Sequence, residues 1–379
     1  MGSLVLIAAL AFGGGPASAA AAAPAGSSPW PEALHDATHS ATASVAGPAT
    51  GHVEWTRPLG GNITPGPVVG ANGTIYVATN AGVLHAIDPA TGTDVWTFDG
   101  GAPYIAGADL STSPLILPSG SILWPGPQDT LFDLSASGQA LWSHRLSGTV
   151  LSPVLSGTRV YVGLMSGSLR ELDVSGSMPE LGWSVTIGHQ SFGNPVVSPD
   201  GHVITTVDKS VVSIADRGTS GVVRWRHTAS ATIEVSPSVA VNGDVYVTAN
   251  DGSAYALRED GTLIWRKHIG QESYSSSSVS PSGLLYFGDN GGSLNIVRAS
   301  DGDLVRSDHG LRGIWSAQVI DAHGDVYFGS QGHYIYGFNA SGRQLFRVHA
   351  RGPIDSYPAL TGNGTLIIGD QVGTLYAIG

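Results

Sequence analysis

Short apolar segments alternate with turn-forming residues along most of this chain. Residues 63–101 contain four such segments, and residues 233–270 contain four more in the same order. The first segment follows a proline, the second carries a tyrosine between apolar residues, and the fourth contains a tryptophan. Pairs such as Asn72-Gly73 and Asp260-Gly261 separate the segments, and such pairs suit tight hairpins. The pattern predicts a repeated unit of four antiparallel strands.

The unit recurs along the chain with a period near 40 residues. The second segment can be recognised eight times, at Tyr76, Trp124, Tyr161, Ile204, Tyr246, Tyr286, Tyr327 and Ile367. A period near 40 with four strands per unit is typical of a β-propeller. We therefore predict an all-β fold, an eight-bladed β-propeller of four-stranded antiparallel blades. The tryptophans of the fourth segment should dock and pack the blades, and they are Trp55, Trp96, Trp142, Trp183, Trp225 and Trp265.

The two ends of the repeat region complement each other. The last repeat, residues 351–379, stops before its fourth segment, whereas the segment 52–59 has no repeat before it. We expect this N-terminal strand to complete the last blade, because a closed ring covers strand edges that would otherwise be exposed. The propeller domain would then span residues 52–379.

The N-terminal region has a different composition. An apolar run at residues 4–12 is followed by Ala17-Ser18-Ala19, which together resemble a secretory signal and its cleavage site. We expect a signal peptide over residues 1–19, a flexible lead-in over residues 20–51, and a location that is secreted or on the exterior of the cell envelope, extracellular or periplasmic. The run is too short to span a membrane. A merely disordered alanine-rich terminus is the alternative.

Composition narrows the classes of function. The net charge of −12 would repel phosphate, so we expect no nucleic-acid partner. The sequence has no cysteine, which excludes disulfides, thiolate metal sites, a cysteine nucleophile and lipid attachment through cysteine. A ring without open sheet edges needs no oligomer, so we expect a monomer. His35 and His39 lie four residues apart, but no helical pattern supports that spacing, and no metal site is predicted.

The repeat resembles a known family. The segment Asp88 to Trp96 (DPATGTDVW) is similar to the tryptophan-docking repeat of quinoprotein alcohol dehydrogenases. The same PQQ-like repeat occurs in the propeller subunit of the outer-membrane barrel-assembly machine. Residues 30–41 (WPEALHDATHSA) also resemble a lead-in common to secreted members. The dehydrogenases use a vicinal cysteine pair with PQQ and Ca²⁺, and this chain lacks the cysteines. We therefore expect no cofactor, with PQQ or Ca²⁺ as the alternative.

The fold directs attention to the loops that precede the first strand of each blade. In propellers these loops open on one face near the axis, and such loops commonly carry function. A purely structural repeat would keep one residue type there, but this chain varies it. The resulting candidate binding residues at the channel mouth are His189, Phe192, Glu234, Glu272, Tyr274, Arg312, Trp315, Asp355 and Tyr357. Arg312 would offset the acids. Ordinary loop variation is the alternative.

The loop between Trp96 and Pro114 is about six residues longer than its equivalents. We expect its extra residues, around Pro103-Tyr104-Ile105, to project over the same face. The leading hypothesis is a secreted, non-catalytic propeller that binds a protein, a peptide or a cell-envelope ligand through this face. One alternative is a quinone- or Ca²⁺-dependent sugar or alcohol dehydrogenase. A second is a polysaccharide hydrolase or lyase that uses Glu234 and Asp355.

Overall fold

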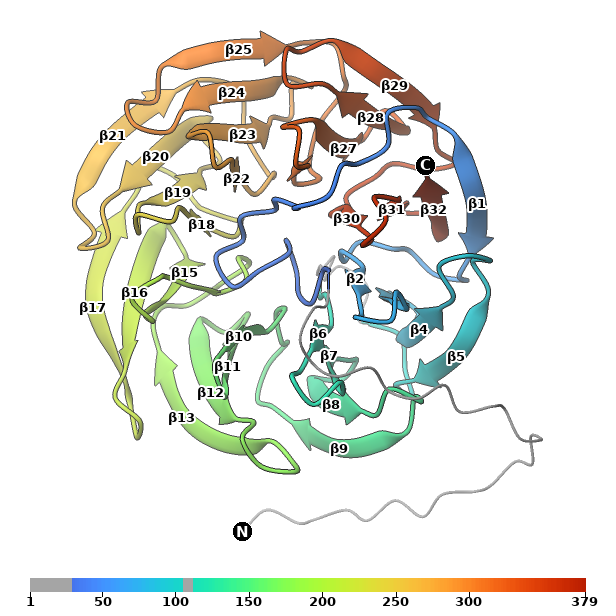
Figure 1. Ribbon diagram of the computed structural model, residues 1–379. Coiled ribbons are helices and arrows are strands. Elements are labelled where there is room, and N and C mark those ends of the chain that lie inside the picture. Colours follow the sequence, from blue (N-terminus) through green and yellow to red (C-terminus); the bar gives the residue numbers. More distant parts are fainter. Residues whose placement is uncertain (1–28, 105–111) are drawn as a thin grey trace.

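The computed structural model describes residues 29–104 and 112–379, so the expected signal peptide over residues 1–19 lies outside the described residues. Within them, strands β1 to β32 form eight four-stranded antiparallel sheets, and no helix occurs. Figure 1 shows the sheets arranged like blades around a central axis. The predicted eight-bladed propeller is confirmed.

Each blade is built from strands in sequence order, with the first strand innermost. Blade 1 contains β2 (Val68–Val69), β3 (Ile75–Thr79), β4 (Val83–Ile87) and β5 (Asp94–Asp99). Blade 2 contains β6 (Leu115–Ile116), β7 (Ile122–Pro125), β8 (Thr130–Leu134) and β9 (Ala140–Arg145). Blade 3 contains β10 (Val154–Ser156), β11 (Arg159–Leu164), β12 (Ser168–Asp173) and β13 (Glu180–Thr186). Blade 4 contains β14 (Val196–Val197), β15 (Val203–Val207), β16 (Ser210–Asp216) and β17 (Gly221–Thr228).

The second half of the ring repeats this order. Blade 5 contains β18 (Ser238–Val239), β19 (Val245–Thr248), β20 (Ser253–Leu257) and β21 (Leu263–His268). Blade 6 contains β22 (Ser278–Val279), β23 (Leu284–Gly288), β24 (Leu294–Arg298) and β25 (Leu304–Asp308). Blade 7 contains β26 (Val319–Ile320), β27 (Val326–Ser330), β28 (Tyr334–Phe338) and β29 (Gln344–His349). Blade 8 contains β30 (Ala359–Leu360), β31 (Leu366–Gly369), β32 (Thr374–Ile378) and β1 (Val53–Pro58).

The chain termini close the ring as predicted. Strand β1 pairs antiparallel with β32, for example Thr56 with Tyr376 and Arg57 with Leu375. The last blade therefore combines the two ends of the propeller domain. This pairing protects an edge of β32 that the C-terminal segment alone would leave open.

Burial explains why each strand position has its own residue pattern. Every sheet packs against a blade on each side, so middle strands such as β3 are buried at every position and read as continuous apolar runs. The outermost strand β5 alternates between half-buried and exposed positions, because less material covers it. Core clusters lie between neighbouring blades, and one of them joins Tyr76 of blade 1 to Trp124 of blade 2.

The repeated tryptophans lie between neighbouring blades. The indole Nε1 of Trp225 donates to the carbonyl of Glu259 in the next blade at 2.7 Å. A Cβ atom added to Gly261 would lie 2.5 Å from the Trp225 ring, so glycine in this turn lets the indole lie flat against the backbone. Equivalent indole bonds to backbone carbonyls are made by Trp55, Trp96 and Trp265, whereas Trp183 Nε1 donates to the carboxylate of Asp216 at 2.9 Å. Trp142 makes no such bond to any described residue.

The lead-in departs from the flexible segment that was expected for residues 20–51. From residue 29 on it crosses the axis of the ring (Figure 1), and Trp30, Leu34 and Ala41 are almost completely buried. Its backbone pairs with the last residues of the innermost strands in blades 1, 2, 4, 5 and 7. The bonds are Val69 N to Trp30 O, Ile116 N to Pro31 O, Val197 N to Ala37 O, Val239 N to Thr38 O and Ile320 N to Ala41 O.

This pairing has a simple physical cause. The innermost strand of each blade is an edge strand, and its unpaired N–H groups near the axis need acceptors. The lead-in supplies them with backbone carbonyls, and in blade 3 the Glu32 carboxyl accepts the N–H of Leu155 at 3.1 Å. The contacts all lie where the innermost strands end, so the lead-in covers one end of the axis. We call this the far end, and the opposite end, where these strands begin, the mouth.

Among the residues that the structure describes, no helix has the length and apolarity needed to cross a lipid bilayer.

Candidate binding site at the channel mouth

A ring of polar residues surrounds the axis on the mouth side of the innermost strands. The residue before the proline position of one blade bonds to the equivalent residue of the next, so that Ser113 N donates to Ser152 Oγ at 2.8 Å. The series continues from Ser152 N to Asn194 Oδ1, Asn194 N to Ser236 Oγ, Ser236 N to Ser276 Oγ, Ser275 Oγ to Ser316 O, Ser316 Oγ to Ser356 O, and Ser356 Oγ to Pro65 O. One of these bonds links the two neighbouring blades at each of seven successive junctions, from blades 2 and 3 round to blades 8 and 1.

This ring was not among the predicted features, although the sequence contains a signal for it. A serine or asparagine stands directly before four of the prolines, at Ser113, Ser152, Asn194 and Ser236. A short polar side chain at that position satisfies the first free N–H of the neighbouring blade.

The ring is interrupted at the junction of blades 1 and 2. Gly66 occupies the equivalent position in blade 1, and the Oγ of the buried Ser113 has no partner among the described residues. A Cβ atom on Gly66 would lie 3.0 Å from the Cβ of Tyr357. Glycine therefore leaves room for Tyr357 beside blade 1.

Tyr357 precedes the first strand of blade 8 and is half-buried. Burial raises the pKa of its hydroxyl. The aromatic ring of Tyr357 packs against the small cluster of Leu34, Ala41 and Ala317. Tyr357 thus connects the start of blade 8 with the lead-in.

The loops before blades 6 and 7 bring an acidic and aromatic group together. The rings of Tyr274 and Trp315 meet edge to face, with 5.3 Å between their centroids. The Tyr274 hydroxyl donates to Glu272 at 2.7 Å, and this bond, with burial and the charges of Glu272 and Glu234, raises the pKa of Tyr274 to about 12. The Trp315 indole donates to Asn290 Oδ1 at 3.0 Å. Both aromatic side chains are half-buried, so part of each stays open to solvent.

The other expected site residues have different roles. Both carboxylate oxygens of Asp355 accept amide bonds, one from Gln331 and one from Gln371. Arg312 is exposed and makes no ion pair with an acid among the described residues. The His189 side chain is 97% exposed and lies 3.4 Å from Asp208. Phe192 is half-buried.

The long loop between blades 1 and 2 does not extend from Tyr104 as expected. The Tyr104 hydroxyl bonds to the carbonyl of Pro125 at 2.5 Å and to Thr112, and its ring packs in the core between these blades. Burial raises the pKa of Tyr104 well above its usual range. Ile105 and the rest of the insertion, to Ser111, lie outside the described residues.

The histidines of the lead-in lie among residues that hold this segment in place. His39 is 1% exposed and bonds to the backbone of Pro237, and burial lowers its pKa to about 4. Asp36 accepts bonds from Thr38 N at 3.0 Å and from Ser40 N at 3.1 Å. Burial alone would raise the pKa of Asp36, but bonds from His35, Ser40 and Thr38 outweigh it and hold the pKa well below its usual range.

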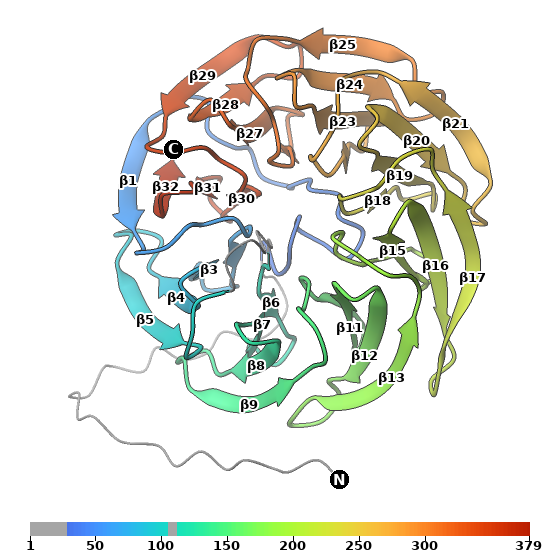
Figure 2. The ribbon, with the colours of Figure 1, turned by 180° about the vertical axis from the view of Figure 1, so that it is seen from behind.

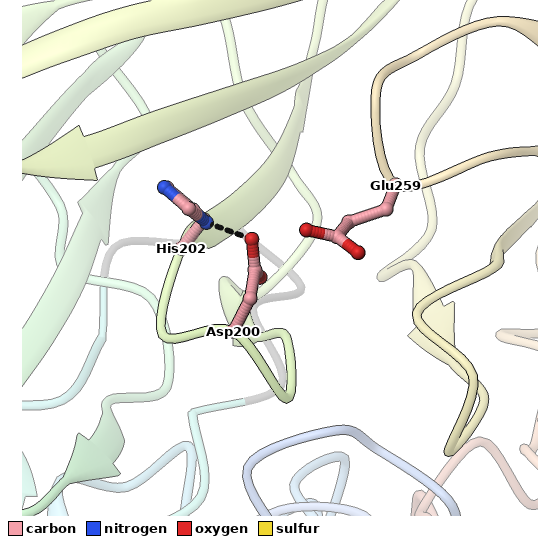
Figure 3. Close-up of side chains that lie close together, drawn as sticks. All are labelled: Asp200, His202 and Glu259. Carbon is pink, nitrogen blue, oxygen red and sulfur yellow. Dashed lines mark hydrogen bonds and ion pairs between the residues drawn. The ribbon is translucent and has the colours of Figure 1, made fainter.

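Two groups of metal-ligand type exist in the described part of the chain, and neither lies at the mouth. Asp200, His202 and Glu259 form one group, shown in Figure 3, with ligand atoms all within 4.8 Å of one another. Asp321, His323 and Asp325 form the other. Both lie on hairpin turns at the far end of the blades, because the first strand of each blade runs away from the mouth.

The mouth does not fit PQQ with Ca²⁺. A Ca²⁺ ion needs six or more oxygen ligands, several of them free carboxylates or carbonyls. Asp355 is already held by two amides, and Glu272 accepts the hydroxyl of Tyr274.

Comparison with known proteins places this architecture in a family. A family model described as outer membrane protein assembly factor BamB matches residues 39–178 and 167–333. The curated BamB of Moranella endobia is 26% identical over 272 residues, which are 67% of this chain and 64% of that protein. The chain thus spans less than two thirds of the length of this relative.

Solved structures agree at the level of the fold. Quinohemoprotein alcohol dehydrogenase from Comamonas testosteroni superposes with a TM-score of 0.74 at 13% identity, over 92% of this chain and 80% of that one. BamB from Moraxella catarrhalis gives a TM-score of 0.68 at 14% identity, over 86% of this chain and 99% of that one. The family model covers well over half of the sequence, so this chain belongs to the family described as outer membrane protein assembly factor BamB.

Proposed function

We propose that this protein is a non-catalytic propeller of the cell envelope that binds a partner protein through the mouth. The observation that carries the proposal is the acidic and aromatic group of Glu234, Glu272, Tyr274 and Trp315. It lies at the end of the axis that the lead-in leaves open. Family membership supports a role in the assembly of outer-membrane proteins, because that is what the matched family is named for.

The chemistry of the mouth favours a cationic segment of the partner. The polar atoms of Tyr274 and Trp315 are already bonded, so the parts of the rings left for a ligand are apolar faces. Aromatic faces attract Lys and Arg side chains, and neighbouring carboxylates add to the attraction. The net charge of −12 extends that preference over the whole molecule. We therefore propose an extended peptide segment that carries Lys or Arg.

Peptide binding tests the proposal directly. Fluorescein-labelled peptides of equal length, one rich in Lys and Arg, one rich in Glu and one uncharged, would be titrated with the protein and followed by anisotropy. We expect the basic peptide to bind, and the Trp315→Ala and Glu272→Gln variants each to weaken it roughly fivefold or more. The matched control is Glu180→Gln, which removes an exposed acid from β13 of blade 3 and should leave the affinity unchanged.

Two results would contradict this function. Equal binding of the acidic peptide, or equal affinity of the Trp315→Ala variant and the wild type, would remove the mouth as the binding surface. Saturable binding of PQQ with Ca²⁺, accompanied by reduction of a dye in the presence of an alcohol, would instead support the dehydrogenase alternative.

A further inference from the structure

The hairpin between the first and second strands has a regular composition from blade to blade. The residue before its glycine is uncharged in most blades, at Asn72, Ser119, Asn242, Ser282 and Asn363. Blade 4 departs from this rule with Asp200 before Gly201, and His202 follows that glycine; in blade 7, His323 and Asp325 flank Gly324. A turn needs neither the Asp200 nor the His202 side chain to reverse the chain.

The neighbouring blade 5 also has an unusual residue in one of its hairpins. The hairpin between the third and fourth strands presents a backbone carbonyl to the docking tryptophan, and at three other blades the residue is Pro89, Ala136 or Ala299. In blade 5 it is Glu259. The docking role uses only the main-chain oxygen, so the Glu259 carboxylate is left for another purpose.

The fold brings the side chains of Asp200, His202 and Glu259 close together. The bond from Trp225 to Glu259 holds the blade 5 turn against blade 4, and Figure 3 shows the Glu259 carboxylate directed toward Asp200 and His202. His202 Nδ1 pairs with Asp200 Oδ2, and Arg224 Nη1 lies 3.4 Å from the same oxygen. Two carboxylates that face each other repel unless a cation or a proton lies between them.

We propose that Asp200, His202 and Glu259 bind one divalent transition-metal ion that links blades 4 and 5. One imidazole nitrogen and two carboxylate oxygens suit Zn²⁺ better than Ca²⁺ or Mg²⁺, which prefer sites made of oxygen alone. The ion would take the place of the proton between His202 and Asp200, and water would complete its coordination at this partly exposed site.

The second cluster shows why this group is the better candidate. In the turn of blade 7 the backbone N–H groups of His323, Asp325 and Gly47 all donate to Asp321, at 2.8, 2.9 and 2.7 Å. That carboxylate shapes its own turn and holds the lead-in. The bonds to Asp200 come from the side chains of Ser198, His202 and Arg224, which can rotate away when an ion binds.

Zinc titration of the chelator-treated full chain, followed by calorimetry and by thermal unfolding, tests the site. Variants are taken from other blades so that they suit the turns: Glu259→Ala matches Ala136 and Ala299, and His202→Thr matches Thr74 and Thr365. We expect one Zn²⁺ per chain in the wild type, at least tenfold weaker binding in each variant, and a zinc-dependent rise in Tm that both variants lose. His323→Asn, in the blade 7 turn, is the matched control and should bind as the wild type does.

Each other result would overturn the proposal. Absence of zinc binding to the wild type, or equal binding by Glu259→Ala, would remove the site. Equally tight binding of Ca²⁺ or Mg²⁺ would contradict the choice of metal. The peptide titrations are independent of this outcome, because the mouth and this turn lie at opposite ends of the blades.

Discussion

At the scale of single residues, the polar side chains of the lead-in are matched to buried positions. Glu32 is 5% exposed and is the acceptor for the N–H of Leu155. Burial raises its pKa to about 8, the Leu155 bond opposes that shift, and the charge of Asp36 adds to it. Glu32 is therefore protonated in the folded protein at neutral pH, which spares the cost of a buried charge.

Glu32 should make stability depend on pH. Its pKa in the folded protein lies above the ordinary value of 4.5, so its contribution is fully present below pH 4.5 and is lost as the pH rises through 8. Glu32→Gln keeps an acceptor for Leu155 but cannot ionise. We expect the variant to gain stability over the wild type between pH 4.5 and 8, by up to roughly 1.4 kcal/mol per pH unit. Urea unfolding at several pH values measures the difference.

His39 changes the stability with pH in the opposite direction to Glu32, but it does not affect the difference between the wild type and Glu32→Gln. Its pKa of about 4 lies below the ordinary 6.5, so its contribution is present above pH 6.5 and is lost as the pH falls toward 4. Both proteins carry His39, so its effect cancels in the difference. Parallel pH profiles for the wild type and Glu32→Gln would show that Glu32 is not buried as described.

At the scale of elements, the docking tryptophans differ in how completely they are engaged. Trp265 is 7% exposed, and its Nε1 donates to Ala299 at 2.8 Å. Trp142 is only half-buried, stacks on His144 and lacks the bond to the next blade. The period of the sequence predicted both positions equally well. It could not predict the difference, because the bond depends on how closely the turn of the next blade approaches the indole.

Substitution of these two tryptophans should therefore have unequal effects. We expect Trp265→Ala to lower the free energy of unfolding by about 3–5 kcal/mol, through lost packing and a lost bond. Trp142→Ala should cost clearly less. Denaturant midpoints of the two variants, measured beside the wild type, provide the comparison, and equal losses would contradict the docking geometry.

At the scale of the whole molecule, the ring is closed twice. Strand β1 completes blade 8 at the periphery, and the lead-in joins the blades at the axis. Figure 2 shows the ring from the side opposite to Figure 1. The central closure covers one end of the axis and leaves the other to the mouth residues. Because the lead-in covers the far end, only the mouth offers a surface for binding near the axis in the described part of the chain.

Removal of the residues before position 48 should open the far end selectively. We expect faster hydrogen exchange at the N–H groups of Val69, Ile116, Val197, Val239 and Ile320, because their acceptors lie in the lead-in. The N–H groups that pair β1 with β32 provide the internal control and should stay protected, since both strands remain. Unchanged exchange at the five positions would show that the lead-in does not pair with the innermost strands in solution.

The amino-acid sequence alone determined the eight blades, their four strands and the closing strand. Those features follow from local patterns, the turn pairs and the alternation of apolar segments, which repeat often enough to be counted. It also identified Glu234, Glu272, Tyr274 and Trp315 as residues that depart from the repeat. Only the tertiary structure decided that Glu272 and Trp315 both contact Tyr274, whereas Asp355 accepts bonds from two glutamine amides. The lead-in and the group of Asp200, His202 and Glu259 likewise depend on contacts between residues far apart in the chain, which no local pattern encodes, whereas the serine ring leaves a local signal only at the four positions where Ser or Asn precedes a proline.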